Sequence, residues 1–367
     1  MPARRPGRAR QSGCGNAVGR GNVDDYDAQR CGYAVRGRTG SSLGYRGLVG
    51  LRARGAEEPV PPSNADAAAG VLPLEGVGAA SHASSEEVEH DLGHTRRQQV
   101  EFPKPAPLDR HGPARIVAMC NQKGGVGKTT STINLGAALA EYGRKVLLVD
   151  FDPQGALSVG LGLNPHDLEL SIYNVLTDSS LRAEHILQKT SVSGMDLLPA
   201  NIDLSAAEIQ LVTEVGREQA LYRIVQPLIP HYDVMLIDCQ PSLGLLTVNA
   251  LCASDGVIVP LECEYFALRG VALLQETIEK VRDRLNPRLQ IEGLLATMYD
   301  SRTVHGREVL TRLIEGFDNR VFHTVVGRTV RFPETTVAGQ PITTFAPSSP
   351  GAKAYKQLAR EVLARWE

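Results

Sequence analysis

Hydrophobic residues recur in two alternating patterns from about residue 116 onward. Short runs that are apolar at every position, such as 146–149, alternate with longer segments in which apolar residues recur every three or four positions. The short runs are typical of strands covered on both faces, and the longer segments are typical of amphipathic helices. The alternation predicts βαβ units, so we expect an α/β fold with a doubly wound, mostly parallel sheet and a ligand at the carboxyl ends of its strands.

The same patterns give the approximate limits of each element. The expected strands are Ile116–Asn121, Lys145–Asp150, Met195–Pro199, Val234–Asp238, Gly256–Pro260, Ile291–Tyr299 and about Val321–Val326. The expected helices are Lys128–Tyr142, Leu204–Val212, Gln219–Leu228, Leu243–Ala253, Leu268–Leu285, Gly306–Phe317 and Ala352–Trp366.

The chain before residue 113 has a different composition. Residues 1–54 contain 11 Arg, no Lys and three acids, and residues 55–100 become acidic with Pro- and Ala-rich spacers. Such segments bury too little apolar surface to offset the loss of chain entropy. We therefore expect residues 1–112 to form a disordered, low-complexity tail and residues 113–367 to form one domain. Two other interpretations stay open: a nucleic-acid-binding arm of Arg and Gly, or a start site assigned too far upstream.

The overall composition is that of a globular protein, with 42% hydrophobic and 22% charged residues and a formal net charge of -2. A balance so close to zero means that any nucleic-acid affinity must come from a local patch. The chain has neither an apolar run of about 18 residues nor the apolar core of a signal peptide, so we expect a cytoplasmic protein without stable membrane insertion. Six cysteines without a CxxC pair predict neither a metal site nor a disulfide framework.

A glycine-rich loop follows the first expected strand and precedes the first expected helix. This order, and glycine backbones whose N–H groups can point inward, are what phosphate binding requires. We expect Lys128 to contact the β- and γ-phosphates and the Thr129 hydroxyl to bind Mg²⁺. The strict motif needs Gly where Gln122 stands, and a glycine-rich turn with two chance lysines is the alternative. The candidate ATP-binding residues are Lys123, Gly124, Gly125, Val126, Gly127, Lys128, Thr129 and Thr130.

The loop pattern K-G-G-x-G-K-T-T resembles the deviant Walker A motif of the ParA/MinD group of P-loop ATPases. The resemblance implies ATP and Mg²⁺ as cofactors and a P-loop NTPase domain. It also implies that Lys123 reaches into the nucleotide site of a partner subunit, so that two chains enclose two ATP molecules. A long flexible cation suits this role. Without a partner, a lysine in this loop would be solvated.

Carboxylates end the second and fourth expected strands. The segment 150–155 reads D-x-D-P-Q-G, and the resemblance assigns Asp152 to orient or activate the attacking water and places Asp150 near the Mg²⁺ shell. Helix capping by Asp152 is the alternative. Asp238 ends an apolar run, as in a Walker B motif, where it would support Mg²⁺ through water. Gln240 stands where the group usually carries Pro.

The resemblance to Soj-like proteins continues through 199–204, 242–251 and 260–268, and covers residues 114–367. It implies a slow, partner-stimulated ATPase that forms an ATP-dependent homodimer, binds DNA non-specifically at the nucleoid and acts with a ParB-like activator in chromosome or plasmid partitioning. Candidate DNA contacts are Arg302, Arg328 and Arg331, which could instead be solvated surface groups. Residues 332–336 depart from the usual family sequence.

Four alternative functions are weighed against the sequence. A MinD-like membrane-associated positioning ATPase would need a C-terminal amphipathic helix with bulky apolar and basic faces, whereas 352–366 has balanced charges and should pack on the sheet. A redox protein related to the nitrogenase iron protein would need paired cysteines. A nucleotide-gated DNA-binding scaffold with negligible hydrolysis remains open, as does a role in replication control.

Overall fold

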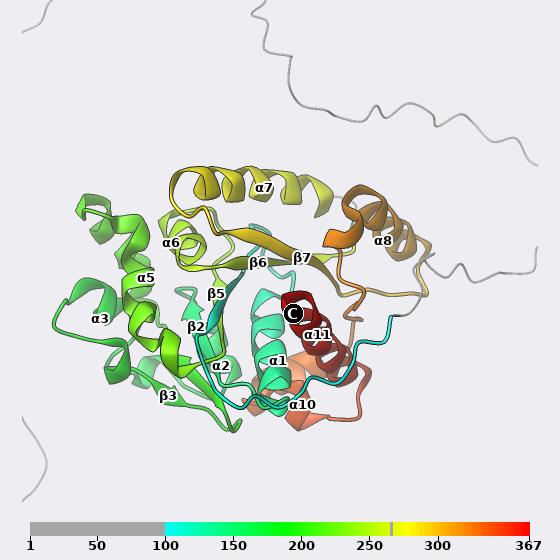
Figure 1. Cartoon of the computed structure of the whole chain (residues 1–367), viewed down its shortest axis with the longest axis horizontal. Coiled ribbons are helices and arrows are strands. Elements are labelled where there is room, and N and C mark those ends of the chain that lie inside the picture. Colours follow the sequence, from blue (N-terminus) through cyan, green and yellow to red (C-terminus); the bar gives the residue numbers. More distant parts are fainter. Residues whose placement is uncertain (1–99, 265–266) are drawn as a thin grey trace, which may run out of the picture. The chain divides into compact units, whose positions relative to one another are not determined.

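The computed structural model describes residues 100–264 and 267–367. Within this part of the chain, seven strands form one sheet with helices on both faces (Figure 1). The strand order is β3-β4-β2-β5-β1-β6-β7, and every pairing except that of β3 with β4 is parallel. The predicted α/β, doubly wound, mostly parallel sheet is confirmed. The predicted tail lies outside the described residues up to residue 99.

The strands are β1 (Arg115–Met119), β2 (Val146–Phe151), β3 (Gln188–Lys189), β4 (Met195–Leu198), β5 (Val234–Cys239), β6 (Gly256–Glu262) and β7 (Gln290–Thr297). The α-helices are α1 (Lys128–Glu141), α2 (Ala156–Gly160), α3 (Ile172–Thr177), α4 (Leu204–Gln210), α5 (Ala220–Val225), α6 (Leu245–Ala253), α7 (Ala267–Arg284), α8 (Val304–Phe317), α9 (Arg331–Ala338), α10 (Ile342–Phe345) and α11 (Pro350–Trp366).

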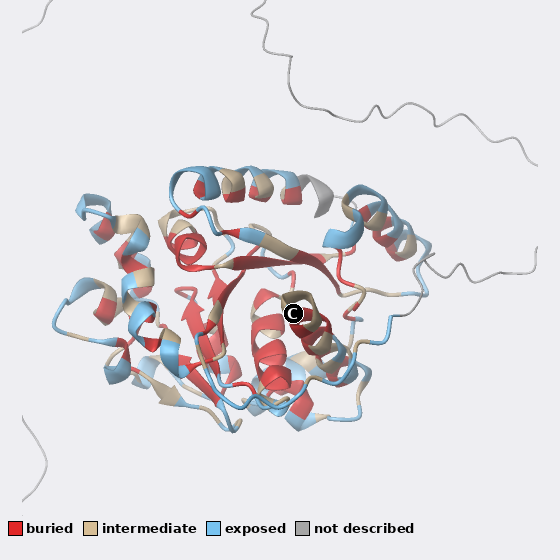
Figure 2. Ribbon diagram, viewed as in Figure 1, coloured by how far each residue is buried: buried red, intermediate tan, exposed pale blue. Residues whose placement is uncertain are grey.

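The sheet separates two hydrophobic cores, because successive side chains of a strand point to opposite faces. In β1, Val117 and Met119 pack with α1, α10 and α11, whereas Ile116 and Ala118 pack with α3 to α8. Figure 2 shows the central strands and the inner sides of these helices as buried. Burial on both faces explains why the central strands are apolar at consecutive positions, and it leaves the strand ends as the place for polar chemistry.

One predicted strand is wrong. Residues 321–326 form no strand: isolated bridges join Leu294 to Val321 and Tyr299 to Gly327, and the N–H groups of 322 and 326 donate to the Leu294 and Ala296 carbonyls of β7. Two backbone N–H groups in this segment, at 323 and 324, donate instead to the Glu361 carboxylate of α11 at 2.7 and 2.9 Å. The segment is apolar because it is buried between β7 and α11, and burial alone does not require a β ladder.

Several short elements were not predicted. They are the antiparallel edge strand β3 and the helices α2, α3, α9 and α10, each of eight residues or fewer. Short elements give too few turns for a periodic pattern to show. Helix α9 begins at Arg331 and contains the segment 332–336, whose sequence departs from the expected family pattern.

Residues 100–112, which the sequence assigned to the tail, lie along the surface of the domain in an irregular path. The Ala106 carbonyl accepts a hydrogen bond from Arg144 Nη1 at 2.8 Å, and the Gly112 N–H donates to Asp233 Oδ1 at 2.8 Å. The Phe102 ring meets the His323 ring edge-on, with centroids 5.9 Å apart. The described chain is therefore fixed to the domain at several points before β1 begins.

The C-terminal helix α11 packs into the core, as predicted for 352–366. Its side chains Tyr355, Leu358 and Val362 are each at most 1% exposed. Burial raises the pKa of Tyr355, whose hydroxyl lies 3.0 Å from Ser131 Oγ on α1. Among the helices of the described residues, none combines the length and the apolar character needed to cross a membrane.

Candidate nucleotide-binding site

The glycine-rich loop connects β1 to α1 at the carboxyl edge of the sheet. Gly125 and Gly127 have φ angles of 75° and 86°, in the left-handed region that L side chains rarely adopt. Gly127 is the N-cap of α1, and its carbonyl accepts the first helical hydrogen bond, from the Ser131 N–H. The loop thus leads directly into a helix N-terminus, where free N–H groups and the helix dipole favour an anion.

Neighbouring strands hold the loop in place. Asn121 Nδ2 donates to the Pro260 carbonyl of β6 at 2.7 Å, and Thr297 Oγ1 at the end of β7 donates to the Val126 carbonyl at 2.8 Å. Gln122, which replaces the Gly of the strict motif, donates through Nε2 to the Gly270 carbonyl at 3.3 Å. The departure from the strict motif therefore ties the loop to the start of α7.

Lys128 has few protein partners for its charge. The residue is 7% exposed, and its Nζ donates to the Lys123 carbonyl oxygen at 3.1 Å. It also lies close enough to Asp238 to lower the pKa of that carboxyl. A buried ammonium group that donates to a backbone carbonyl of the glycine loop is placed where a phosphate oxygen would accept from it.

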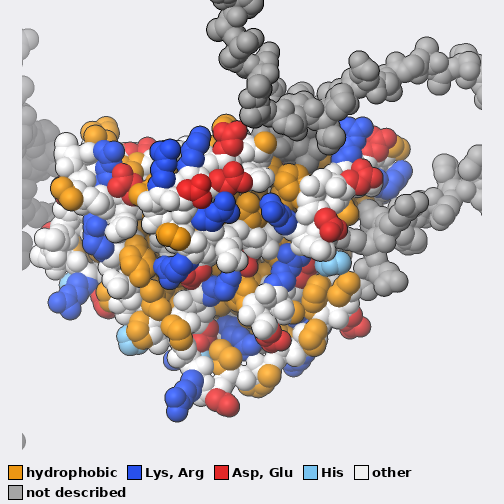
Figure 3. Space-filling model, turned by 45° about the horizontal axis from the view of Figure 1, so that its top comes forward, with side chains coloured by type: hydrophobic (Ala, Val, Ile, Leu, Met, Phe, Trp, Pro, Cys, Tyr) orange, Lys and Arg blue, Asp and Glu red, His pale blue; other side chains and the backbone are white. Residues whose placement is uncertain are grey.

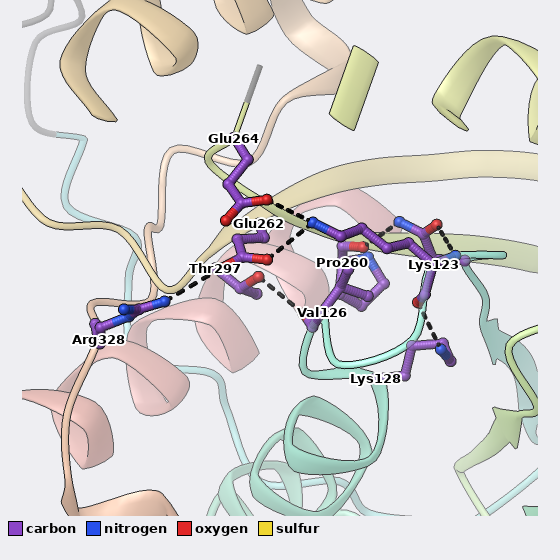
Figure 4. A network of polar contacts seen from close by, with 9 residues as sticks. Lys123, Val126, Lys128, Pro260, Glu262, Glu264, Thr297 and Arg328 are labelled. Atoms are coloured by element: carbon purple, nitrogen blue, oxygen red, sulfur yellow. Dashed lines mark hydrogen bonds and ion pairs between the residues drawn. The ribbon is translucent and has the colours of Figure 1, made fainter. Parts of the chain in front are cut away.

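Lys123 extends in a different direction from Lys128 (Figure 4). Its Nζ lies 3.0 Å from Glu262 Oε2 and 2.7 Å from Glu264 Oε2, at the carboxyl end of β6. Glu262 also pairs with Arg328, at 3.2 Å from Nη2. Lys123 is therefore paired with carboxylates of its own chain and is not merely solvated, and its expected contact with the nucleotide of a partner subunit stays a prediction. Sequence reasoning missed the two glutamates, whose only signal was their place at the end of an apolar strand.

Thr129 and Asp238, each predicted from the sequence to take part in a magnesium site, are in direct contact. Thr129 Oγ1 donates to Asp238 Oδ2 at 2.6 Å, and Thr132 Oγ1 lies 3.4 Å from the other carboxylate oxygen. Burial, followed by the charge of Asp150, raises the pKa of Asp238 well above its ordinary value. A nearby cation would stabilise the charged form of such a carboxylate, which supports the assignment to Mg²⁺.

Asp150 lies beside Asp238 in the register of β2 and β5. Its Oδ2 accepts from the Ser158 N–H at 2.9 Å and from Ser158 Oγ at 2.7 Å, so it also anchors α2. Burial raises the pKa of Asp150 to about 6, against the opposing effect of these hydrogen bonds. Asp152, which is 8% exposed, accepts from the Gln154 N–H at 3.0 Å in a tight turn, whereas the N-cap of α2 is Gly155. The capping alternative for Asp152 is therefore not observed.

Gln240 follows β5 in the segment where the family usually has Pro. Its Nε2 donates to Glu208 Oε1 of α4 at 3.0 Å, and the same oxygen lies 3.4 Å from the Leu246 N–H in the first turn of α6. Glu208 therefore bridges the segment after β5 and the N-terminus of α6. The substitution replaces the rigidity of a proline ring with a side-chain contact to α4.

A cavity of about 300 Å³ adjoins the loop and the first turn of α1. Its walls mix apolar side chains with backbone and hydroxyl groups, as a pocket for a planar heterocycle requires. Sequence reasoning missed these residues, because segments after β7 form the wall only in the folded chain. The lining includes Gly127, Thr130, Met298, Val326, Phe332 and Pro333.

The three candidate DNA-binding arginines each have an acidic partner. Arg302 forms a two-point contact with Asp300, Arg331 pairs with Glu334 at 2.7 Å, and Arg328 pairs with Glu262. Arg302 is 88% exposed on its side chain, which agrees with the surface position expected for it. On the face shown in Figure 3, basic and acidic side chains are interspersed, so no single basic patch stands out there.

The described residues offer no preformed metal cage. Within 100–264 and 267–367, no group of three or more His, Cys, Asp or Glu side chains could hold a metal ion. Mg²⁺ commonly keeps several waters and uses one or two carboxylates with substrate phosphates, which fits Thr129 and Asp238. Four cysteines of this part are free and buried, and burial raises the pKa of Cys252 and Cys263 to about 12, so neither thiol is reactive.

Comparisons with known proteins agree with this geometry. A family model described as an AAA domain matches residues 114–291. The Bacillus subtilis sporulation initiation inhibitor protein Soj is 47% identical over 250 residues, which cover 68% of this chain and 98% of Soj. The chromosome partitioning protein ParA of Caulobacter vibrioides is 44% identical over 255 residues, covering 69% of this chain and 95% of that protein. The chain belongs to the ParA/Soj family of P-loop ATPases. An uncharacterized protein of Mycobacterium tuberculosis is more similar still, at 62% identity over 275 residues, or 75% of this chain and 86% of that one.

Solved structures of similar proteins include one with a bound nucleotide and magnesium. A Mycobacterium smegmatis structure described as cobyrinic acid a,c-diamide synthase, with ADP and magnesium bound, has a TM-score of 0.62 and 44% identity over 69% of this chain and 95% of that one. The cell division ATPase MinD of Pyrococcus furiosus has a TM-score of 0.56 and 26% identity over 68% and 99% of the two chains. As a ParA/Soj-family ATPase, the chain uses ATP and Mg²⁺.

Proposed function

We propose that this ParA/Soj-family protein acts in chromosome or plasmid partitioning as an ATPase that dimerises with ATP and holds DNA non-specifically until hydrolysis. The observation that supports this most is the division between the two loop lysines. Lys128 is buried within the loop, whereas Lys123 points out of it and is 41% exposed on its side chain. A cation placed at the edge in this way can meet phosphate charge on another chain.

The phosphate loop supplies the binding groups for the triphosphate. N–H groups of residues 124–127 and the N-terminus of α1 would face the phosphates, with Lys128 donating to them. Thr129 and Asp238 would hold Mg²⁺, and Asp150 would support it from beside Asp238. The cavity lined by Met298 and Phe332 would take the adenine ring. Magnesium supplies charge neutralisation between the phosphates when it is bound.

Asp152 would orient the attacking water. It directly follows β2, two residues beyond Asp150, with one carboxylate oxygen already held by the Gln154 N–H. We expect intrinsic turnover to be slow, because P-loop switches depend on a further group to complete the charge-stabilising site. A ParB-like activator would supply that stimulus, and the protein would act in the cytoplasm at the nucleoid.

DNA retention would depend on Arg302, Arg328 and Arg331. Each arginine is already paired with an acid, so a phosphate would have to compete with that partner. Exposed ion pairs are worth about 0–1 kcal/mol each, and a polyanion can displace them. Two copies joined by ATP would add their phosphate contacts, which makes retention dependent on the dimer.

A MinD-like membrane role is less well supported. The apolar face of α11 is committed to the core through Tyr355, Leu358 and Val362, so the helix does not offer that face to a bilayer. A DNA-binding scaffold with negligible hydrolysis uses the same site and differs only in turnover.

Steady-state phosphate release separates these functions. The full chain should hydrolyse ATP slowly alone and faster with DNA and a cognate activator, and Asp152→Ala should remain bound to DNA with ATP while losing turnover. No phosphate release above background from the wild type under any of these conditions would leave the scaffold, and equal, measurable release by the wild type and Asp152→Ala would remove Asp152 from the reaction. ATP-dependent binding to vesicles in place of DNA would favour the membrane role.

A further inference from the structure

The ion pairs of Lys123 connect the phosphate loop to the end of β6. Lys123 Nζ contacts both Glu262 Oε2 and Glu264 Oε2, at 3.0 and 2.7 Å. Glu262 is the last residue of β6 and is 14% exposed on its side chain, whereas Glu264 is 50% exposed. The two carboxylates approach the ammonium group from the β6 side, away from Lys128 (Figure 4).

We propose that Glu262 and Glu264 are positioning residues that hold Lys123 on its own chain and compete for its ammonium group with the phosphates of a second chain. The inference rests on the proposed ATP-dependent dimer. One ammonium group cannot satisfy two carboxylates and a phosphate cluster in different places at once. Each dimer contact made by Lys123 therefore requires both ion pairs to break, and their strength sets how much ATP is needed to join two chains.

The backbone on both sides of this contact is fixed. Glu262 pairs in register with Thr297 of β7, and the Thr297 hydroxyl holds the Val126 carbonyl of the loop at 2.8 Å. On the loop side, the Lys123 N–H donates to Asn121 Oδ1 at 3.0 Å. Because the loop backbone is held at these points, a rotation of the Lys123 side chain can exchange its two positions without a rearrangement of the loop.

Arg328 lowers the desolvation cost that Glu262 would carry when Lys123 moves away. A mostly buried carboxylate without any cation beside it carries a large desolvation cost. Arg328 Nη2 lies 3.2 Å from Glu262 Oε1, so Glu262 keeps one cation when Lys123 leaves. Arg328 therefore weakens the hold on Lys123, and its removal should act in the opposite direction to removal of the glutamates.

The test measures dimerisation of the full chain by sedimentation velocity against the concentration of a non-hydrolysable ATP analogue with Mg²⁺. The double substitution Glu262→Gln and Glu264→Gln keeps side-chain size and removes both charges. It should lower the analogue concentration at half-maximal dimer by about 3- to 10-fold, the range expected for one or two partly exposed ion pairs. Glu141→Gln is the matched control, because it removes the ion pair with Lys356 at the far end of α1, and it should not shift the midpoint.

The outcomes separate the inference from the function on which it rests. If the wild type forms no dimer with the analogue, the proposed function fails and the inference with it. If the wild type dimerises and the double variant needs as much analogue or more, only the inference fails. With Lys123→Ala added, the two Gln substitutions should give no gain, and a gain that persisted would also contradict the inference.

A second measurement needs neither nucleotide nor dimer. The hydrogen bond that Lys123 Nζ donates to the Glu264 carboxylate is the main cause that raises the pKa of Lys123. In NMR titrations of the nucleotide-free chain with isotope-labelled dimethyl-lysines, Glu264→Gln should lower this pKa and Arg328→Ala should raise it. Glu264 is half exposed, so its single substitution should fold even if the double variant does not. An unchanged pKa in both variants would overturn the inference.

Discussion

The charged groups at the phosphate loop are buried and lack full partners, whereas those of the candidate DNA-binding arginines are paired with nearby acids. At the loop, Asp150 and Asp238 are buried side by side with raised pKa values, and Lys128 donates to a backbone carbonyl. At the surface, Arg302 and Arg331 each lie beside a carboxylate from a residue two or three positions away.

The difference shows which site depends on a ligand. Buried charges without full partners cost free energy, and a magnesium nucleotide brings both the cation and the anion that would relieve them. The exposed arginines already form ion pairs with nearby carboxylates. A DNA phosphate would replace one ion-pair partner with another, so the net gain in free energy for each arginine would be small. Arg328 stands between the two cases, because its partner Glu262 also holds Lys123.

The largest effect is expected from Lys128→Ala. Removal of a buried ammonium group that donates to phosphate should weaken ATP binding by at least about 100-fold, because hydrogen bonds to charged groups contribute about 1.5–3 kcal/mol each. Isothermal titration calorimetry with Mg²⁺ measures the change. Lys356→Ala removes a surface ammonium group at the far end of α1 and should bind ATP like the wild type. Wild-type affinity in Lys128→Ala would refute the assignment of the loop.

A smaller effect should appear in the pH dependence of stability. The folded-state pKa of Asp150, about 6, exceeds the unfolded value of about 4, so the folded chain binds the proton more tightly between these values. The contribution of Asp150 to the free energy of unfolding therefore falls as pH rises from about 4 to 6, by about 2 kcal/mol.

Asp150→Asn should flatten that decline, because the amide oxygen can still accept from Ser158 without a charge to bury. Urea unfolding of the nucleotide-free chain at several pH values tests this expectation. The same slope in the wild type and in Asp150→Asn would show that Asp150 does not titrate in this range. Asp300→Asn is the surface comparison: Arg302 lowers the pKa of Asp300 to about 2, below this window, so its slope should match the wild type.

The smallest effects are expected at the arginines. Arg302→Ala should leave the free energy of unfolding unchanged within experimental error, because its ion pair with Asp300 is exposed. In the ATP-bound state it should instead reduce the slope of log affinity for DNA against log salt by about 1 for each phosphate that the arginine neutralises in the wild type. A salt slope unchanged in Arg302→Ala would remove this residue from the DNA surface. Arg312→Ala, a change at another basic residue of the same region, provides the comparison.

The sequence predicted those parts of the site that lie close together along the chain. The loop 123–130 follows the apolar strand β1, and Asp150 and Asp238 lie near the ends of the apolar strands β2 and β5. Their place at the carboxyl edge could therefore be inferred from strand patterns. Glu262 is also at a strand end, but its meeting with Lys123 depends on β6 lying next to β1. Strand order is a long-range property that local patterns do not contain.

The errors in the predicted fold also come from long-range contacts. Residues 321–326 have the composition of a strand, yet Glu361 of α11 accepts from the N–H groups of 323 and 324, whereas those of 322 and 326 donate to β7. The cavity lined by Met298 and Phe332 likewise needs the segment after β7 to fold against α1. In both cases, contacts with segments distant in the sequence determine the structure, and local sequence patterns do not reveal those contacts.

Sedimentation of the full-length Asp152→Ala chain with Mg²⁺ and either ATP or ADP tests the central claim most directly. The account predicts a species of twice the chain mass with ATP and a single chain with ADP, because only the triphosphate brings two loops and their Lys123 side chains together. A single chain under both conditions, with ATP shown to be bound, would contradict the account.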